Sequence, residues 1–150
     1  MSGMTSPSFE HKVQRLKGQF ASLQNAQKYE LLMEMGRRLP PYPEALKTPE
    51  RVVSGCQSTL YLAAALKEEK IEFIACSEAL ISSGLAALLV AVYSGESPEV
   101  VLQCPPTFLE ELGIFASLSA GRSNGLYHIH LRMKQEALKI FSCRFSANLA

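Results

Sequence analysis

The segment Val52-Val53-Ser54-Gly55-Cys56-Gln57-Ser58 places one cysteine in a short polar turn between two apolar runs. These runs, residues 51–53 and 59–66, have the composition of β-strands. Because a packed cysteine prefers an apolar face, a thiol in such a turn is expected to be presented to solvent. Gly55 permits a positive φ and has no side chain to block approach to the sulfur. The segment therefore predicts an accessible thiol between two strands.

The neighbours of Cys56 add polar groups to the turn. Gln57 and Ser58 could donate hydrogen bonds to a thiolate, which would favour ionisation of the thiol. A single cysteine is nevertheless more often an inert packing residue than a reactive one. The turn by itself therefore leaves a reactive and a structural role open.

Composition limits the classes of protein that fit the chain. A length of 150 residues suits one domain, here 1–150, with a hydrophobic content of 47% to form its core. A net charge of +1 provides no basic surface for nucleic acid. The first nine residues lack a secretory signal, and the longest apolar run, 85–93, is about half a membrane span. We expect a cytoplasmic protein that binds neither nucleic acid nor membrane.

The four cysteines are Cys56, Cys76, Cys104 and Cys143, and no CxxC or CxxH motif occurs among them. Paired spacing for a metal site is therefore absent, and separate thiols in a reducing compartment are expected. The histidines at positions 128 and 130 are two residues apart, so on a helix they would point to different faces. We expect no metal and no cofactor bound to this chain.

The periodicity of apolar residues predicts a fold in which helices surround a small sheet. Charged residues 67–70 form the turn of an antiparallel hairpin, and a proline-rich connector, residues 40–49, precedes the first strand. The predicted fold class is α+β, with a small three-stranded antiparallel sheet packed against helices and flexible ends at about 1–9 and 142–150. The expected strands are 51–53, 59–66 and 71–75. The first two expected helices are 11–23 and 25–39, the second with Asn25 as N-cap, and the third is 77–93, capped by Ser77. A short helix opened by Ser97-Pro98, another at 107–112, and a final helix after a loop at 117–125 complete the prediction.

Three blocks of sequence together resemble the SufE family, and they occur in the order that the family shows. The resemblance covers roughly residues 20–137, which is most of the chain. The first block is Tyr29-Glu-Leu-Leu-Met-Glu-Met-Gly36, Arg38-Leu-Pro-Pro41, Thr48-Pro-Glu-Arg51 and Gly55-Cys-Gln-Ser58; the second is Ser77-Glu-Ala79, Gly84-Leu85 and Ala87-Leu-Leu89; the third is Leu118-Ser119 and Arg122-Ser-Asn-Gly-Leu126.

The resemblance implies a SufE/IscU-like fold and a role in sulfur transfer. Cys56 would accept sulfur from the persulfide of a pyridoxal-phosphate-dependent, SufS-like cysteine desulfurase, stimulate that enzyme, and deliver the sulfur to a SufBCD-like iron-sulfur cluster scaffold. The chain would act as a carrier and activator without turnover of its own, and a homodimer is left open. The residues that match the family's partner-binding positions are Gly55, Gln57, Ser58, Glu78, Arg122, Ser123 and Asn124.

The chain departs from the family at several positions. Glu78 stands where an aspartate is usual, Tyr61 where tryptophan is common, Ala120 where proline is frequent, and Cys76 near a position that is often acidic. None of these residues lies in the Cys56 turn. The departures leave the predicted chemistry intact and bear on the choice of partner.

Two other classes of function remain open at this stage. A metal- or cluster-binding scaffold would use Cys56, Cys76 and Cys104, which requires three distant segments to meet. A non-catalytic interaction module would bind and tune a desulfurase by docking alone, without a reactive thiol.

Overall fold

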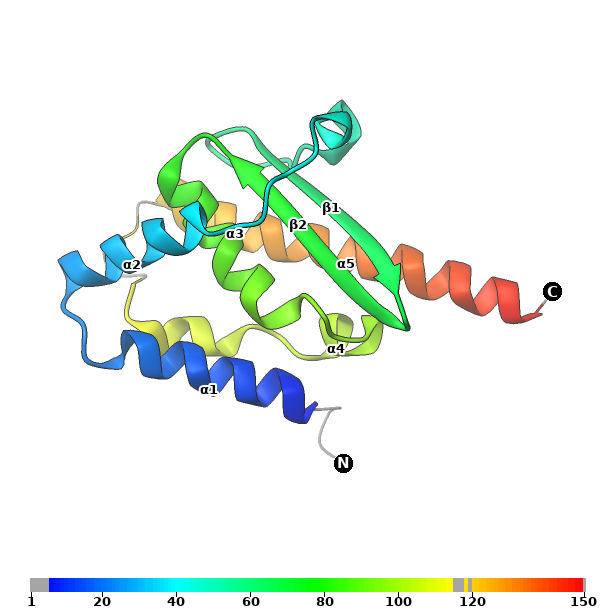
Figure 1. Ribbon diagram of the computed structural model, residues 1–150, viewed down its shortest axis with the longest axis horizontal. Helices are drawn as coiled ribbons and strands as arrows, with labels where there is room; N and C mark the ends of the chain where they lie inside the picture. Colours follow the sequence, from blue (N-terminus) through cyan, green and yellow to red (C-terminus); the bar gives the residue numbers. More distant parts are fainter. Residues whose placement is uncertain (1–5, 115–117, 119, 150) are drawn as a thin grey trace.

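The computed structural model describes residues 6–114, 118 and 120–149, with the side chains of 120–122 and 144–149 excepted. Figure 1 shows a β-hairpin and a set of helices packed around a central helix, α3. In chain order the elements are α1 (Pro7–Ala21), α2 (Asn25–Arg37), the 3-10 helices η1 (Glu44–Leu46) and η2 (Pro49–Arg51), β1 (Leu60–Lys67), β2 (Lys70–Ser77), α3 (Leu80–Tyr93), α4 (Pro98–Gln103), the 3-10 helix η3 (Thr107–Leu112) and α5 (Ala120–Leu149).

The first two helices have the amphipathic pattern that predicted them. Helix α1 begins earlier than expected because Ser6 caps it, accepting a hydrogen bond from the amide of Phe9, and Pro7 occupies the first turn. Helix α2 begins at Asn25, so the N-cap is Gln24 and the expected cap at Asn25 is wrong by one residue. It ends at Arg37, before the proline-rich connector.

Helices α2 and α3 approach each other closely at two glycines. A Cβ atom on Gly84 would lie 2.4 Å from the carbonyl oxygen of Leu32, and one on Gly36 would lie 2.7 Å from the Gly84 amide nitrogen. Only hydrogen fits at either position, which brings the two backbones into direct contact. This contact fixes α2 on the central helix.

The sheet contains two strands rather than the predicted three. β1 and β2 pair antiparallel from Leu60 opposite Ser77 to Lys67 opposite Lys70. The expected strand at 51–53 is wrong, because Arg51 ends η2 and Val52 forms only an isolated bridge to Tyr61. Proline at position 49 favours the start of a helical turn, and the Cys56 turn closes immediately after residue 53, which leaves no length for a third strand.

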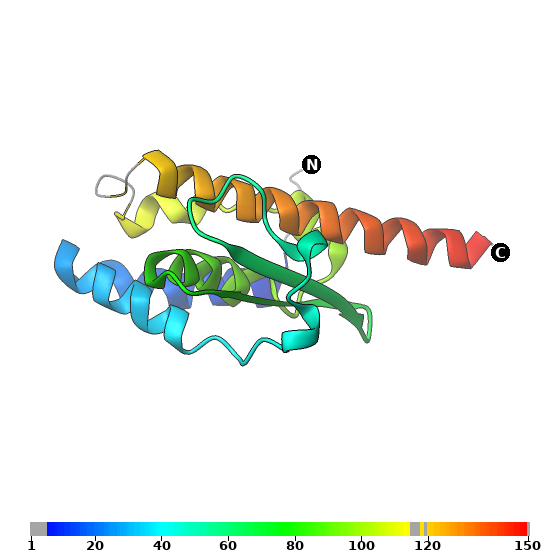
Figure 2. The ribbon, with the colours of Figure 1, turned by 90° about the horizontal axis from the view of Figure 1, so that it is seen from above.

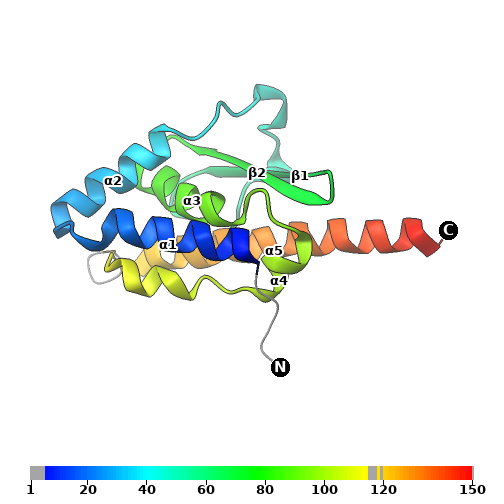
Figure 3. The same ribbon diagram turned by 60° about the horizontal axis from the view of Figure 1, so that its bottom comes forward.

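The hairpin packs against two helices. β2 contacts α3, and β1 contacts α5. Figure 2 shows α5 running past the hairpin and extending beyond it toward the C-terminus. In Figure 3, α3 lies between the hairpin and α1, so the central helix is covered on both sides. This arrangement explains why α3 is apolar around most of its circumference and buried along most of its length.

Two predicted boundaries need correction. Ser77 is the last residue of β2 and does not cap α3, whose N-cap is Ala79. The expected loop at 117–125 is helical from Ala120, and residues 117 and 119 of that loop lie outside the described residues. Gly125, at its end, lies in α5 and contacts Cys56, a tertiary contact that the weak helix propensity of these small residues does not indicate. Within the two end segments expected to be flexible, residues 7–9 and 142–149 are helical.

The remaining elements agree with the sequence. Ser97 caps α4 by accepting a hydrogen bond from the Val100 amide, and η3 covers the predicted range as a 3-10 helix that ends at Gly113. Among the described residues, no helix is both long and apolar enough to cross a bilayer.

Candidate functional site

The Cys56 turn connects η2 to β1. Its base is closed by a hydrogen bond of 2.9 Å from the amide of Val53 to the carbonyl oxygen of Leu60, and both of these residues are buried. Gly55, in the turn, has φ of 90°, a left-handed conformation that favours glycine. Gln57 is exposed. A buried base therefore presents a polar, glycine-hinged turn at the surface.

The thiol of Cys56 is half-buried against helix α5. Its Sγ atom points to the carbonyl oxygen of Gly125, at 3.9 Å, and donates a weak hydrogen bond to it. Beside it, the backbone of Gly55 packs on the ring of His128, where an added Cβ would lie 2.3 Å from the Cδ2 atom. The turn is therefore fitted to α5 through two glycines.

Burial raises the pKa of the Cys56 thiol above its ordinary value. No cation among the described residues offsets this effect, and the Gly125 carbonyl accepts a hydrogen bond but has none to donate to a thiolate. The neutral thiol is therefore favoured while the sulfur rests on α5. Because the thiolate is the nucleophile, burial at this position restrains the reactivity of the sulfur.

Arg132 connects the segment before the turn to α5. Its Nη1 atom donates to the carbonyl oxygen of Val52 at 3.0 Å, its Nη2 atom donates to the carbonyl oxygen of Glu50, and its Nε atom pairs with Glu136 at 3.0 Å. The sequence reading missed this residue. The available signal was the spacing of Arg132 and Glu136, four residues apart on a predicted helix, which is typical of an ion pair.

A groove of about 650 Å³ borders the other side of the turn. The end of the turn forms one wall, and the end of β2 with the bend that follows forms another. Ser77 joins the two walls, since its hydroxyl donates to the carbonyl oxygen of Thr59 at 2.8 Å. The lining residues are Lys47, Ser58, Thr59, Tyr61, Cys76, Ser77, Glu78 and Ala79.

Most of the residues that the sequence predicted for partner binding surround the turn. Ser58 and Glu78 share the groove, although they are twenty positions apart in the chain. Ser123 is half-buried and Asn124 is exposed in the first turns of α5, directly before the glycine that accepts the bond from Cys56. The side chain of Arg122 lies outside the described residues.

The three thiols required by the scaffold alternative are in different environments. Cys104 is buried at the end of α4, where its carbonyl oxygen accepts a hydrogen bond of 2.6 Å from Tyr93. Cys76 is half-buried in the groove, and Cys56 faces α5. Within the described part of the chain, no group of three or more His, Cys, Asp or Glu side chains is placed to hold a metal ion.

A comparison with protein families assigns the chain. The family model described as SufE, an Fe-S metabolism associated domain, matches residues 14–137. The chain belongs to the SufE family. This match confirms the resemblance inferred from the sequence blocks, and it contains the Cys56 turn and the part of α5 that holds it.

Relatives of this SufE-family chain occur in several organisms. The sulfur acceptor protein CsdE of Escherichia coli is 35% identical over 82% of this chain and 90% of its own length. SufE-like protein 1, chloroplastic/mitochondrial, of Arabidopsis thaliana is 37% identical over 86% of this chain, but the match spans only 35% of that longer protein. The cysteine desulfuration protein SufE of Plasmodium vivax is 35% identical over 67% of this chain and 41% of its own length.

A solved structure has a similar fold. The solution structure of a hypothetical protein from Thermus thermophilus superimposes with a TM-score of 0.74 at 26% identity, and the match covers 87% of this chain and 96% of that one. The α+β architecture is therefore shared with a solved protein, and its sheet has two strands rather than the predicted three.

Proposed function

We propose that this SufE-family protein is a sulfur acceptor and carrier that receives persulfide sulfur from a cysteine desulfurase on Cys56. The observation that carries the proposal is the position of that thiol, half-buried on α5 in a surface turn hinged at Gly55. The names of the relatives, a sulfur acceptor protein and a cysteine desulfuration protein, support the same class of function.

The proposed reaction is a thiol exchange. The Cys56 thiolate attacks the outer sulfur of a cysteine persulfide on the desulfurase and forms a new S–S bond. The original S–S bond of the donor breaks, and its cysteine leaves as a thiolate. The proton lost from Cys56 is taken up by solvent or by the leaving thiolate. The chain itself needs no cofactor, because the pyridoxal phosphate belongs to the desulfurase.

The resting position of the sulfur suits a carrier. Against α5 the Cys56 thiol is favoured in its neutral form, so it reacts slowly with stray oxidants and electrophiles. The turn would lift the sulfur off Gly125 to enter the desulfurase, and would shelter the persulfide when it returns. Gly55 permits the change of backbone direction that such a movement needs.

The surroundings of the turn provide two surfaces for the desulfurase. The groove on one side contains Ser58 and Glu78, and the start of α5 on the other side carries Ser123 and Asn124. We expect a desulfurase docked over the turn to contact both surfaces. Gly55, Gln57 and the Arg122 side chain complete the expected interface.

The proposal extends to the partners on either side of the transfer. The desulfurase would be of the SufS type, and its activity would rise because Cys56 removes the persulfide that otherwise blocks another turnover. The loaded protein would then deliver its sulfur to a SufBCD-like scaffold for iron-sulfur clusters. In this scheme the chain is an accessory to the enzyme and not an independent catalyst.

The test is incubation of the purified protein with a SufS-type desulfurase and cysteine, followed by mass spectrometry without reductant. Wild type is expected to gain the mass of one or more sulfur atoms on the peptide that contains Cys56, and to stimulate cysteine turnover. Cys56→Ser is expected to lose both effects. Cys143→Ser is the matched control, because this thiol is exposed and lies far along α5, and it should behave as wild type.

The same experiment separates the carrier from a docking module. A module that acts by binding alone would stimulate the desulfurase equally well with Cys56→Ser. Undiminished stimulation by that variant, or sulfur found on a different cysteine, would reject the carrier role of Cys56.

A further inference from the structure

Three residues of α5 contact the Cys56 turn and the segment before it. Gly125 accepts the hydrogen bond from the thiol, the ring of His128 packs on Gly55, and Arg132 binds two backbone carbonyl groups. Their spacing along the helix places them on one face over about two turns. The turn and the segment before it therefore pack against a single face of α5. The contacts made by Arg132, the last of the three residues, are hydrogen bonds.

The bonds of Arg132 act on the backbone at the base of the turn. Glu50 lies within η2, and Val52 is the C-cap residue that leads from η2 into the turn. A planar guanidinium can bind two such acceptors from a fixed direction, which a lysine ammonium cannot reproduce. These bonds tie the segment to α5 independently of the Cys56 side chain.

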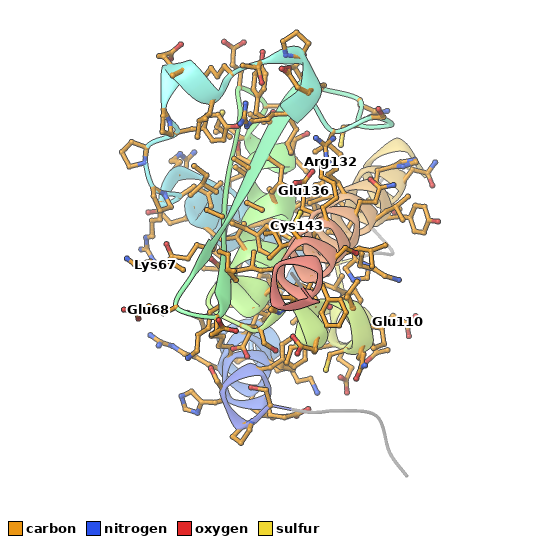
Figure 4. The ribbon with its side chains drawn as sticks, turned by 90° about the vertical axis from the view of Figure 1, so that its right-hand side faces the viewer. Lys67, Glu68, Glu110, Arg132, Glu136 and Cys143 are labelled. Carbon is orange, nitrogen blue, oxygen red and sulfur yellow. The ribbon has the colours of Figure 1, made fainter. Side chains whose placement is uncertain are left out.

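The guanidinium is itself held in place. Glu136, one turn further along α5, accepts a bond of 3.0 Å from its Nε atom, and Arg132 and Glu136 are only 17% and 18% exposed in their side chains. Figure 4 shows the two residues next to each other on α5. An ion pair that is largely removed from water keeps a more constant geometry than a surface pair, so Arg132 is a rigid support.

We propose that Arg132 is a positioning residue that anchors the base of the Cys56 turn to α5. With this anchor in place, only the backbone of residues 53–59 can move together with the Cys56 sulfur. The anchor therefore limits how often the sulfur leaves the Gly125 carbonyl. Its meaning for sulfur transfer rests on the proposed function, but the anchoring itself is a property of the free protein. Loss of Arg132 should therefore increase the accessibility of Cys56 in the absence of any partner.

The test is alkylation of the free, folded protein with iodoacetamide, followed by mass spectrometry of each cysteine-containing peptide. Arg132→Gln is expected to raise the labelling rate of Cys56 roughly three- to tenfold, since two hydrogen bonds that hold the turn are weakened. Cys104 is the internal reference, because a buried thiol reacts only when the whole domain opens. Its rate should change much less than that of Cys56.

Three further variants sharpen the test. Arg132→Lys keeps the positive charge but loses the planar set of N–H donors. Its Cys56 should therefore be alkylated more slowly than in Arg132→Gln but faster than in wild type. Glu136→Gln removes the support of the guanidinium and should give a smaller increase, which keeps the test informative if Arg132→Gln folds poorly. Lys139→Gln is the matched control, because it also pairs with Glu136, at 3.5 Å, but is not bonded to the turn, and it should label as wild type.

The outcomes are distinct. An unchanged rate at Cys56 in both Arg132→Gln and Glu136→Gln would overturn the proposal. A parallel rise at Cys56 and Cys104 would also overturn it, because Arg132 would then stabilise the whole fold and not the turn. Since no desulfurase is present, these results do not depend on whether Cys56 accepts sulfur, which the Cys56→Ser experiment decides separately.

Discussion

The Sγ atom of Cys56 lies 3.9 Å from the carbonyl oxygen of Gly125, a residue 69 positions away in the chain. This contact joins the turn before the hairpin to the long C-terminal helix, and it places the proposed sulfur acceptor under a backbone acceptor group. Burial at this contact favours the neutral thiol and therefore restrains the reactivity of the sulfur.

The pKa of the Cys56 thiol should be higher in the folded protein than in the unfolded chain. Burial raises its pKa, so the native state holds the thiol proton more tightly than the unfolded chain does. The stability that results is fully present below the unfolded pKa and is lost as pH rises through the native pKa. Ultraviolet absorbance of the thiolate, in a variant with the other three cysteines replaced by alanine, should show a higher midpoint in buffer than in urea. A lower midpoint in buffer would contradict the burial argument.

Gly55→Ala should destabilise the protein by about 3 kcal/mol, because it combines a strained φ with a collision against the His128 ring. Gly95→Ala is the matched control: its φ of 87° is similar, but the nearest atom to an added Cβ is the Lys12 Nζ atom at 3.6 Å. This control should cost only about 1 kcal/mol. His128→Ala added to Gly55→Ala should recover part of the loss in urea unfolding. Equal losses for Gly55→Ala and Gly95→Ala would show that the turn does not press on His128.

Gly84→Ala should destabilise the packing of α2 on α3 by about 2 kcal/mol or more, because an added Cβ would lie 2.4 Å from the Leu32 carbonyl oxygen. Gly18→Ala in α1 is the control, since nothing lies within 4 Å of its added Cβ. There alanine should stabilise the helix by about 0.5–1 kcal/mol. Thermal unfolding of the two variants should therefore shift in opposite directions.

Glu96→Gln should cost about 2 kcal/mol, because this carboxylate is buried and accepts bonds from Lys12 at 2.6 Å, Ser8 at 2.8 Å and Ser6 at 2.9 Å. Burial opposes its ionisation, but these bonds outweigh burial and lower the pKa of Glu96. The stabilisation is therefore present above the unfolded pKa and is lost as pH falls through the native pKa.

The measurement is urea unfolding of wild type and Glu96→Gln from neutral to acidic pH. Their difference in unfolding free energy should shrink as pH falls. Glu72→Gln is the control, because this glutamate is exposed on β2 and its replacement should change stability by less than about 0.5 kcal/mol. If the difference in unfolding free energy between wild type and Glu96→Gln stays constant with pH, the ionised form of Glu96 is not what stabilises the fold.

The parts of the fold that sequence predicted well are those with a strong local pattern. The apolar stripe of α1, the capping serine of α4 and the charged turn of the hairpin are each encoded within a few residues. The errors fell where local signals were weak. Residues 51–53 look like a strand by composition, and 120–125 look like a loop, but local composition does not show the tertiary contacts that these segments make, from Arg132 to the Val52 carbonyl and from Cys56 to the Gly125 carbonyl.

The candidate site divides in the same way. The glycine-containing turn around Cys56 and the SufE family were predicted from sequence. The expectation that the thiol is presented to solvent needs correction, because Cys56 is half-buried against α5. The groove that joins Ser58 to Glu78, and the anchor at Arg132, were not, because each depends on segments that meet only after folding.

Sequence by itself therefore determined which family the chain belongs to and predicted that Cys56 is the functional thiol, since both rest on short contiguous segments of the chain. Tertiary structure alone decided where that sulfur rests and what holds it there. The physical reason is that these features arise from contacts between residues far apart in the chain. Cys56 is half-buried against α5 and hydrogen-bonded to Gly125, and Arg132 donates hydrogen bonds to two backbone carbonyl groups 80 and 82 positions away.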